Sequence, residues 1–177
     1  DPLVSASEGN YKVIGEFLAA HPNERARELL GSLSLKDLRD VTMEVLEDSY
    51  AATESQLCPR VENEFLVPYK HWFLSNIPAA QQEKLRSIEA LCKFVTDSIK
   101  VLEIPYAWTI PQSPISVWQT RRCYANSRDI FFVSLARTLG IDARKNPVTG
   151  KVQTRRDGED WSNINFTPAS DQKGKGT

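Results

Sequence analysis

The segment RRCYAN, Arg121–Asn126, holds the residue types best suited to nucleophilic chemistry in this 177-residue chain. The residues that follow predict an amphipathic helix that is capped at Asn126 or Ser127, stops at Gly140 and runs straight into a strand. A cysteine near the positive end of a helix and beside arginines has a lowered pKa and reacts as a thiolate. Cys123 is therefore a candidate nucleophile, with a buried structural thiol as the alternative.

Few other side chains in the chain support such chemistry. His21 and His71 are the two histidines, and both precede Cys123 by a long stretch of sequence. The cysteines, Cys58, Cys92 and Cys123, are widely spaced with no CxxC pair, which argues against a zinc or thioredoxin-like site and leaves their disulfide status open. Cys92 falls on the inner face of a predicted helix. We expect no metal and no cofactor.

Composition excludes some classes of partner. The chain has 22 Lys and Arg against 23 Asp and Glu, a net charge of −1, so electrostatics give no case for nucleic acid. The longest apolar run, Ile130–Val133, is too short to cross a bilayer, so we expect no transmembrane segment. Because the chain starts at Asp1 without the layout of a signal peptide, we expect a processed or trimmed form. A downstream domain of the same parent chain is a further expectation.

Hydrophobic periodicity predicts helix after helix in the first half of the chain. One helix runs from Ala79 to about Leu102, and another begins at the cap Ser34 and continues to about residue 54. Tyr11 and Leu35 are placed on inner faces. A short helix follows the cap Ser113, and after Gly140 the pattern alternates as strand, turn and strand.

These elements predict an α+β fold that is mostly α overall. A helical N-terminal region, residues 1–56, packs as one unit with a core at residues 57–166, which holds a small antiparallel sheet. Residues 167–177 form a polar tail or the start of a further domain.

The core resembles the transglutaminase-like superfamily, which shares the fold of papain-like cysteine enzymes. The resemblance rests on Ser113-Pro114, on an arginine-rich turn, on the helix end LARTLGIDAR and on the pattern WxxIxF from Trp161 to Phe166. The segment PRVENEFLVPY, residues 59–69, also resembles a piece that precedes this core in bacterial members. Together the likeness covers roughly residues 57–166.

The resemblance assigns catalytic positions to residues that lack the chemistry. The family's cysteine lies fifteen residues before the glycine matched by Gly140, and eleven after the proline matched by Pro114; both counts reach Ala125. The family's HAW triplet corresponds to EDW, so Glu159 stands where the catalytic histidine would be. Cys123 lies two residues early. The third catalytic position stays open, with Asp171 as the late candidate.

A missing nucleophile and a missing histidine each disable acyl transfer, since an imidazolium keeps the thiolate ionised and then protonates the leaving group. The resemblance implies that Ala125 faces the strand carrying Trp161, opposite Glu159. Arg137 and Arg144 match arginines common in the family, and ion pairs with carboxylates are the plainer explanation.

Three functions remain open at this point. The first is a non-catalytic transglutaminase-like module, a pseudoenzyme that binds or scaffolds polypeptide or glycan in an exported bacterial protein, periplasmic or at the cell surface. The second is a cysteine peptidase, amidase or transglutaminase-type enzyme that uses the displaced Cys123. The third is a purely structural N-terminal domain of a longer chain. Candidate ligand-stacking residues are aromatic: Tyr106, Trp108, Trp118 and Trp161.

Overall fold

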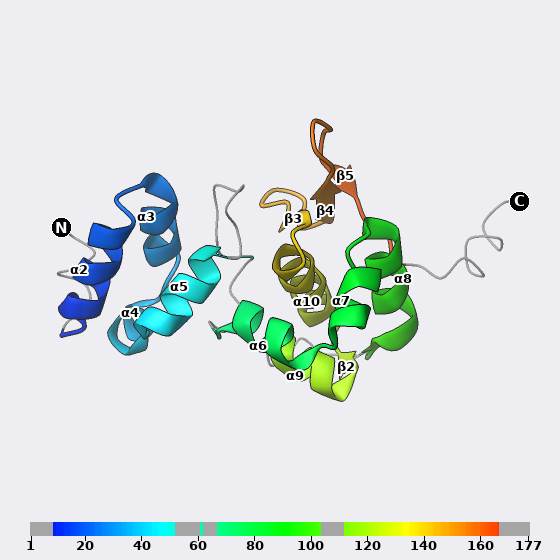
Figure 1. Cartoon of the computed structure of the whole chain (residues 1–177), viewed down its shortest axis with the longest axis horizontal. Helices are drawn as coiled ribbons and strands as arrows, with labels where there is room; N and C mark the ends of the chain where they lie inside the picture. Colours follow the sequence, from blue (N-terminus) through cyan, green and yellow to red (C-terminus); the bar gives the residue numbers. More distant parts are fainter. Residues whose placement is uncertain (1–8, 52–60, 62–66, 104–111, 167–177) are drawn as a thin grey trace, which may run out of the picture.

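The computed structural model describes residues 9–51, 61, 67–103 and 112–166. Over these residues the fold is mixed α+β and mostly helical, as the sequence predicts, with two small sheets. Figure 1 shows the first four helices gathered at one end and the remaining elements grouped around α10. Buried apolar residues form two clusters that match this division.

The N-terminal core is the cluster formed by the first four described helices. These are α2 (Tyr11–Ala20), α3 (Glu24–Gly31), α4 (Leu35–Asp40) and α5 (Met43–Ala51). Ile14 and Phe17 of α2 are fully buried against Leu29 of α3 and Leu46 of α5. Each of these short helices therefore depends on its neighbours for burial of its apolar face.

Side-chain caps fix where two of these helices begin. The Asn23 side chain accepts a hydrogen bond from the Ala26 amide at 3.1 Å, and Ser34 accepts one from the Asp37 amide at 3.1 Å. The cap at Ser34 is the predicted one. The long helix predicted after it is wrong, because Val41 adopts an extended conformation that separates α4 from α5.

The C-terminal core is the cluster formed by the remaining helices and strands. Its helices are α6 (Tyr69–Asn76), α7 (Ala79–Lys84), α8 (Ile88–Ser98), α9 (Pro114–Thr120) and α10 (Ala125–Thr138). The single helix predicted from Ala79 to Leu102 is in fact α7 and α8, because Ser87 is extended and its hydroxyl accepts from the Ala90 amide at 3.0 Å. The predicted cap at Ser113 is confirmed by its bond from the Ser116 amide at 3.2 Å.

Helix α10 is the central element of the C-terminal core. It contacts α6, α8, α9 and β3, and every residue from Ile130 to Thr138 is buried. The prediction of an amphipathic helix is therefore wrong: from Ile130 to Thr138 this helix is covered on all sides rather than on one face. It ends where Gly140 takes a positive φ of 84°, a conformation that suits glycine.

A three-stranded antiparallel sheet packs on α10. Its strands are β3 (Asp142–Lys145), β4 (Val152–Arg155) and β5 (Ser162–Asn163), in that order. Ala143, Val152 and Thr154 are buried on the side that faces the helix, and Asp142 and Arg155 pair on the other side. The sheet is small, as predicted, with one strand more than the two that the sequence pattern indicates.

A second, two-residue parallel pair was not expected from the sequence. It joins β1 (Lys100–Val101) to β2 (Arg122–Cys123), with Val101 opposite Cys123. The chain therefore leaves α8 as a strand at a point where the pattern predicts a helix. This pair holds β2 immediately before the start of α10.

Two apolar side chains predicted to face inward are exposed. Tyr11 is 64% exposed at the start of α2, and Leu35 is 59% exposed at the start of α4. A residue in the first turn of a helix can match the apolar spacing and still extend beyond the packed surface. Cys92 is partly buried at the edge of the C-terminal core, where its thiol donates to the Asn165 carbonyl at 3.5 Å.

The two cores meet where α5 contacts α6. The Asp48 carboxylate of α5 accepts hydrogen bonds from the backbone amides of Lys70 and His71, at 3.0 and 2.7 Å. Lys70 returns a bond from its Nζ to the Ala51 carbonyl at 2.9 Å. Because Pro68 offers α6 no side-chain cap, Asp48 of the neighbouring core supplies it.

Candidate functional site

Helix α10 begins at Ala125, where the resemblance places the family's nucleophile. The N-cap is Tyr124, whose side chain makes no capping bond, so the predicted cap at Asn126 or Ser127 is wrong. Ala125 and Asn126 are exposed, and Lys145 donates to Asn126 Oδ1 at 2.5 Å. Because the side chain of Ala125 is a methyl group, the first residue of α10 provides no nucleophile.

Cys123 lies in β2 just before that helix and is only 1% exposed. Burial raises the pKa of its thiol to about 11, Arg128 lowers it by a smaller amount, and Asp129 adds to the rise. The helix end and the neighbouring arginines were expected to lower it instead. Desolvation of a thiolate in an apolar core outweighs both influences.

Arg121, two residues before Cys123, packs against aromatic rings. Arg121 ends α9 with a positive φ of 56°, and its guanidinium lies 4.1 Å from the centre of the Trp118 ring. It also lies 5.0 Å from the centre of the Phe94 ring and donates to the Trp118 carbonyl at 2.5 Å. Burial lowers the pKa of Arg121. Its charge is thus directed into an aromatic cage and away from a thiolate.

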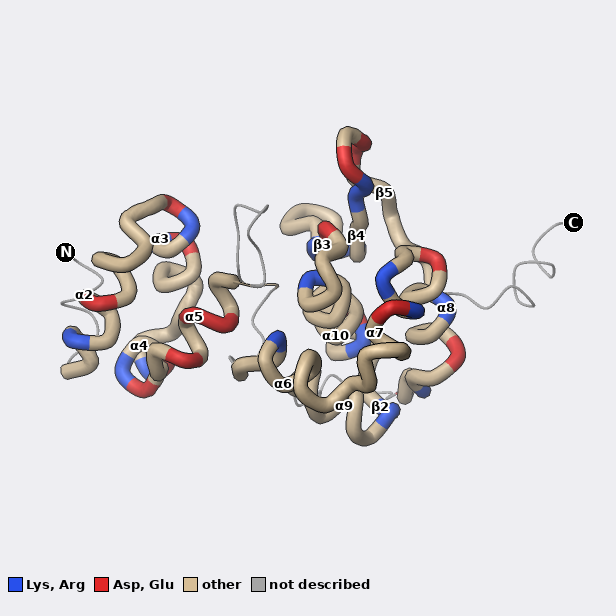
Figure 2. Tube along the Cα trace, in the orientation of Figure 1, with Lys and Arg blue, Asp and Glu red and all other residues tan. Residues whose placement is uncertain are grey.

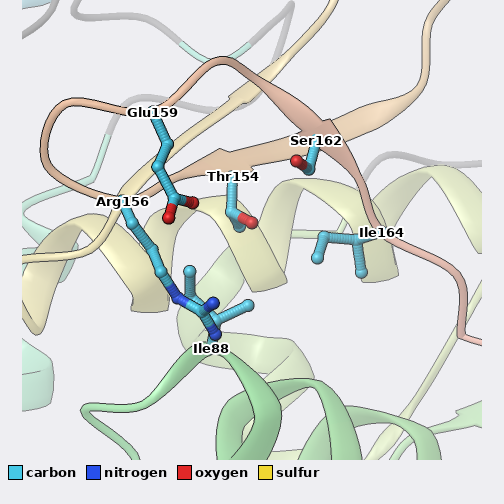
Figure 3. Close-up of a pocket in the computed structure, with 6 residues that line it drawn as sticks. All are labelled: Ile88, Thr154, Arg156, Glu159, Ser162 and Ile164. Atoms are coloured by element: carbon cyan, nitrogen blue, oxygen red, sulfur yellow. The ribbon is translucent and has the colours of Figure 1, made fainter.

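Glu159 lies in the hairpin between β4 and β5, at the mouth of a small pocket. The cavity measures about 140 Å³ and is lined by residues from that hairpin, from its strands and from the start of α8: Ile88, Thr154, Arg156, Glu159, Ser162 and Ile164. Figure 3 shows the Glu159 side chain extending from the hairpin towards Thr154 and Arg156. Arg156 is paired with Glu89 of α8.

Ala125 and Glu159 lie toward opposite ends of the sheet. Lys145, the last residue of β3, reaches the start of α10, whereas Asp142, the first residue of β3, pairs with Arg155 just before the hairpin. Three residue steps of a strand separate these ends, about 10 Å. Figure 1 accordingly shows the β4–β5 hairpin far from β2. The expected facing of Ala125 and Glu159 is not formed.

The aromatic candidates for ligand stacking are already in contact with protein groups. Trp118 packs against Phe73 and Phe94, at centroid distances of 6.3 and 5.6 Å, in addition to Arg121. Trp161 has the guanidinium groups of Arg144 and Arg155 over its ring, at 4.2 and 4.7 Å. Tyr106, Trp108 and the third-position candidate Asp171 lie outside the described residues, as does Cys58.

The family-matched arginines have local partners. Arg137 is buried in α10 and donates from Nε to the Ala143 carbonyl at 2.9 Å, which ties the helix to the sheet. Arg144 donates from Nε to the Gln153 side chain at 3.0 Å. Neither arginine lines the pocket beside Glu159.

The contacts of the two histidines are made in other parts of the structure than β2, which carries Cys123. His21 bonds to Glu47 at 2.9 Å in the N-terminal core. His71 is exposed on α6, and its backbone amide is the one capped by Asp48. In the part of the chain that the structure describes, no group of three His, Cys, Asp or Glu side chains is placed to hold a metal ion.

Reasoning from the sequence missed the pocket, because it is assembled from separate elements. Thr154 and Ser162 lie opposite one another on β4 and β5, and Ile88 comes from the distant helix α8. The charged segment RRDGED, Arg155–Asp160, is the one part of the sequence that points to this site, and its composition is equally typical of a simple turn.

No helix in the described ranges is long and apolar enough to span a bilayer. Comparisons with protein-family models, with curated proteins and with solved structures found no significant match to this chain.

Proposed function

We propose that this chain is a non-catalytic domain of transglutaminase-like type that serves as a binding or scaffolding module for polypeptide or glycan. The proposed setting is an exported bacterial protein. The observation that carries the proposal is the pair formed by Ala125 and Cys123. A methyl group occupies the start of the central helix, and the nearest thiol is buried with a pKa of about 11.

The raised pKa bears directly on reactivity. Near neutral pH, a thiol with a pKa of about 11 is a thiolate in roughly one molecule in ten thousand. Acyl transfer also needs a general acid at the leaving group, and Glu159 lies at the far end of the sheet from Cys123. Both arguments favour a module over the alternative of an enzyme that uses the displaced cysteine.

A purely structural N-terminal domain is the second candidate, and one observation favours it. Trp118, an aromatic residue proposed for ligand stacking, is engaged by Phe73, Phe94 and Arg121. A pocket of about 140 Å³ is also smaller than the several hundred Å³ of most ligand sites. Under this alternative, the domain positions a partner domain and binds no ligand of its own.

The test of the catalytic question is a turnover assay. Purified protein is incubated with glutamine-containing and peptide-amide substrates, and release of ammonia or of new amines is measured beside a Cys123→Ser variant. We expect both proteins to match the uncatalysed background. Turnover by the parent protein that is lost in Cys123→Ser contradicts the non-catalytic proposal and supports the enzyme.

A further inference from the structure

The pocket between the β4–β5 hairpin and the start of α8 has two hydroxyl groups on its wall, those of Thr154 and Ser162. Thr154 is 2% exposed, lines the cavity, and its hydroxyl has no hydrogen-bond partner among the described residues. Ser162 presents a second hydroxyl to the same cavity from the paired position on β5 (Figure 3). Each hydroxyl can accept a hydrogen bond from an occupant that donates one, and each can also donate.

The charge of the pocket is negative on balance. Arg156 is the one cation on its wall within the described residues, and Glu89 of α8 pairs with it. The Glu159 carboxylate has no ion-pair partner in that part of the chain. Figure 2 shows that the tip of the hairpin is acidic, and Asp157 and Asp160 belong to it. A cation therefore fits this wall better than an anion.

Size and shape narrow the occupant further. A cavity of about 140 Å³ is close to the roughly 150 Å³ that is known to hold a benzene-sized molecule. Ile88 and Ile164 supply apolar walls beside the polar groups. A planar cation is more weakly hydrated than an ammonium group, so it loses less on entering a site with such walls.

We propose that this pocket binds a guanidinium group on a short alkyl stem. Glu159 accepts its paired N–H groups, since planar guanidinium and carboxylate match in a two-bond geometry. Thr154 and Ser162 accept from the remaining N–H groups. The stem lies against Ile88 and Ile164. The assignment rests on the binding role proposed above and adds the class of group that is bound.

The experiment is a titration of the whole chain, followed by the backbone amide NMR signals of Thr154, Arg156 and Ser162. The probes are ethylguanidinium chloride and butylammonium chloride at matched ionic strength. We expect saturable shifts with ethylguanidinium at a dissociation constant on the order of 1–10 mM, as befits six heavy atoms. Butylammonium should bind at least fivefold more weakly. Equal affinity for the two probes, or no saturable shift, overturns the proposal.

Variants test which groups make the contact. Glu159→Gln should weaken ethylguanidinium binding about tenfold or more, and Thr154→Val about threefold, without changing the thermal midpoint of unfolding by more than a few degrees. Asp157→Asn is the matched control, because it removes one charge from the same hairpin outside the pocket. If Asp157→Asn and Glu159→Gln lose the same amount of affinity for ethylguanidinium, the proposed contact with Glu159 is contradicted, and general electrostatic attraction explains the binding.

A second probe tests whether the guanidinium group belongs to a polypeptide or to a free small molecule. N-acetyl-arginine methylamide presents the same guanidinium as a protein side chain does. Tighter binding than ethylguanidinium assigns the site to an arginine of a polypeptide, and weaker binding assigns it to a free small molecule. These outcomes are separate from the turnover assay, so a failed titration leaves the non-catalytic proposal standing, and the reverse also holds.

Discussion

At the scale of single residues, the environment of Cys123 decides its chemistry. Cys123 is 1% exposed, and its backbone is held in the strand pair with Val101. Alkylating reagents therefore reach its thiol only when the structure opens. We expect native Cys123 to react with iodoacetamide at pH 7 at least a hundredfold more slowly than in the unfolded chain. Mass spectrometry of the labelled peptides measures this, with the half-buried Cys92 as an internal reference. Rapid labelling at pH 6 to 7 contradicts a buried thiol.

A second prediction concerns repair of the family's catalytic pair. Since Ala125 and Glu159 lie toward opposite ends of the sheet, Ala125→Cys with Glu159→His should gain nothing over Ala125→Cys alone. Both variants, in a Cys123→Ser background, should show the same apparent pKa for alkylation. The pH dependence of the alkylation rate measures it. A pKa lowered by one unit or more in the double variant means that the two positions face each other after all.

Residue types with a local role were predictable from the sequence. Ser34 and Ser113 cap their helices, and Gly140 ends α10, because each acts on backbone a few residues away. Inward-facing positions at helix starts were not predictable: Tyr11 and Leu35 match the apolar spacing and are still exposed. Local pattern cannot report whether a neighbouring element covers the first turn.

At the scale of elements, α6 depends on a cap from another helix. Asp48 accepts from two of its first amides, and α6 has no side-chain cap of its own. We expect Asp48→Ala to reduce the free energy of unfolding by about 1–2 kcal/mol. Urea denaturation followed by circular dichroism measures it. The control is Asp40→Ala, which removes an exposed aspartate and should change stability by less than about 0.5 kcal/mol. Equal effects would exclude a capping role.

The same carboxylate predicts an unusual dependence on pH. Burial raises the pKa of Asp48, although the amides of His71 and Lys70 and the charge of Lys70 lower it by smaller amounts. A carboxyl group whose pKa is higher in the folded state binds its proton more tightly there. Its contribution to stability therefore increases as the pH falls through the folded pKa towards the unfolded one.

The comparison of the parent protein with Asp48→Asn isolates this contribution. Acidification should stabilise the parent protein relative to the variant, which has no proton to gain at this position. Urea denaturation of both proteins at a series of pH values from 7 to 4 measures the difference. A difference that moves in the opposite direction shows that the amide bonds outweigh burial.

Local sequence patterns predict some elements of this fold and leave others undetermined. The strands after Gly140 were predictable, because alternation and turn residues both favour them. The parallel pair of β1 and β2 was not, because Val101 finds its partner Cys123 across the whole of α9. The continuous burial of α10 likewise follows from the four elements around it and not from its own periodicity. The pocket beside Glu159 depends on the same long-range packing.

At the scale of the whole molecule, the division into two cores has a consequence for unfolding. The N-terminal and C-terminal cores each bury their own apolar side chains, and the link between α5 and α6 contains polar bonds from Asp48 and Lys70. All four tryptophans follow Tyr69 in the sequence, and Trp72 and Trp118 pack on the C-terminal core. The fluorescence of Trp72 and Trp118 therefore reports on the C-terminal core, whereas circular dichroism reports on the helices of both cores.

Matched leucine variants use this difference. Leu29 and Leu91 are both fully buried, one in each core, so Leu29→Ala and Leu91→Ala should each cost about 3–5 kcal/mol locally. We expect Leu29→Ala to lower the urea midpoint seen by circular dichroism and to leave the fluorescence midpoint unchanged. Leu91→Ala should lower the fluorescence midpoint. If Leu29→Ala shifts both midpoints equally, the two cores unfold as one cooperative unit, and the bonds of Asp48 and Lys70 couple them more strongly than a helix cap alone would.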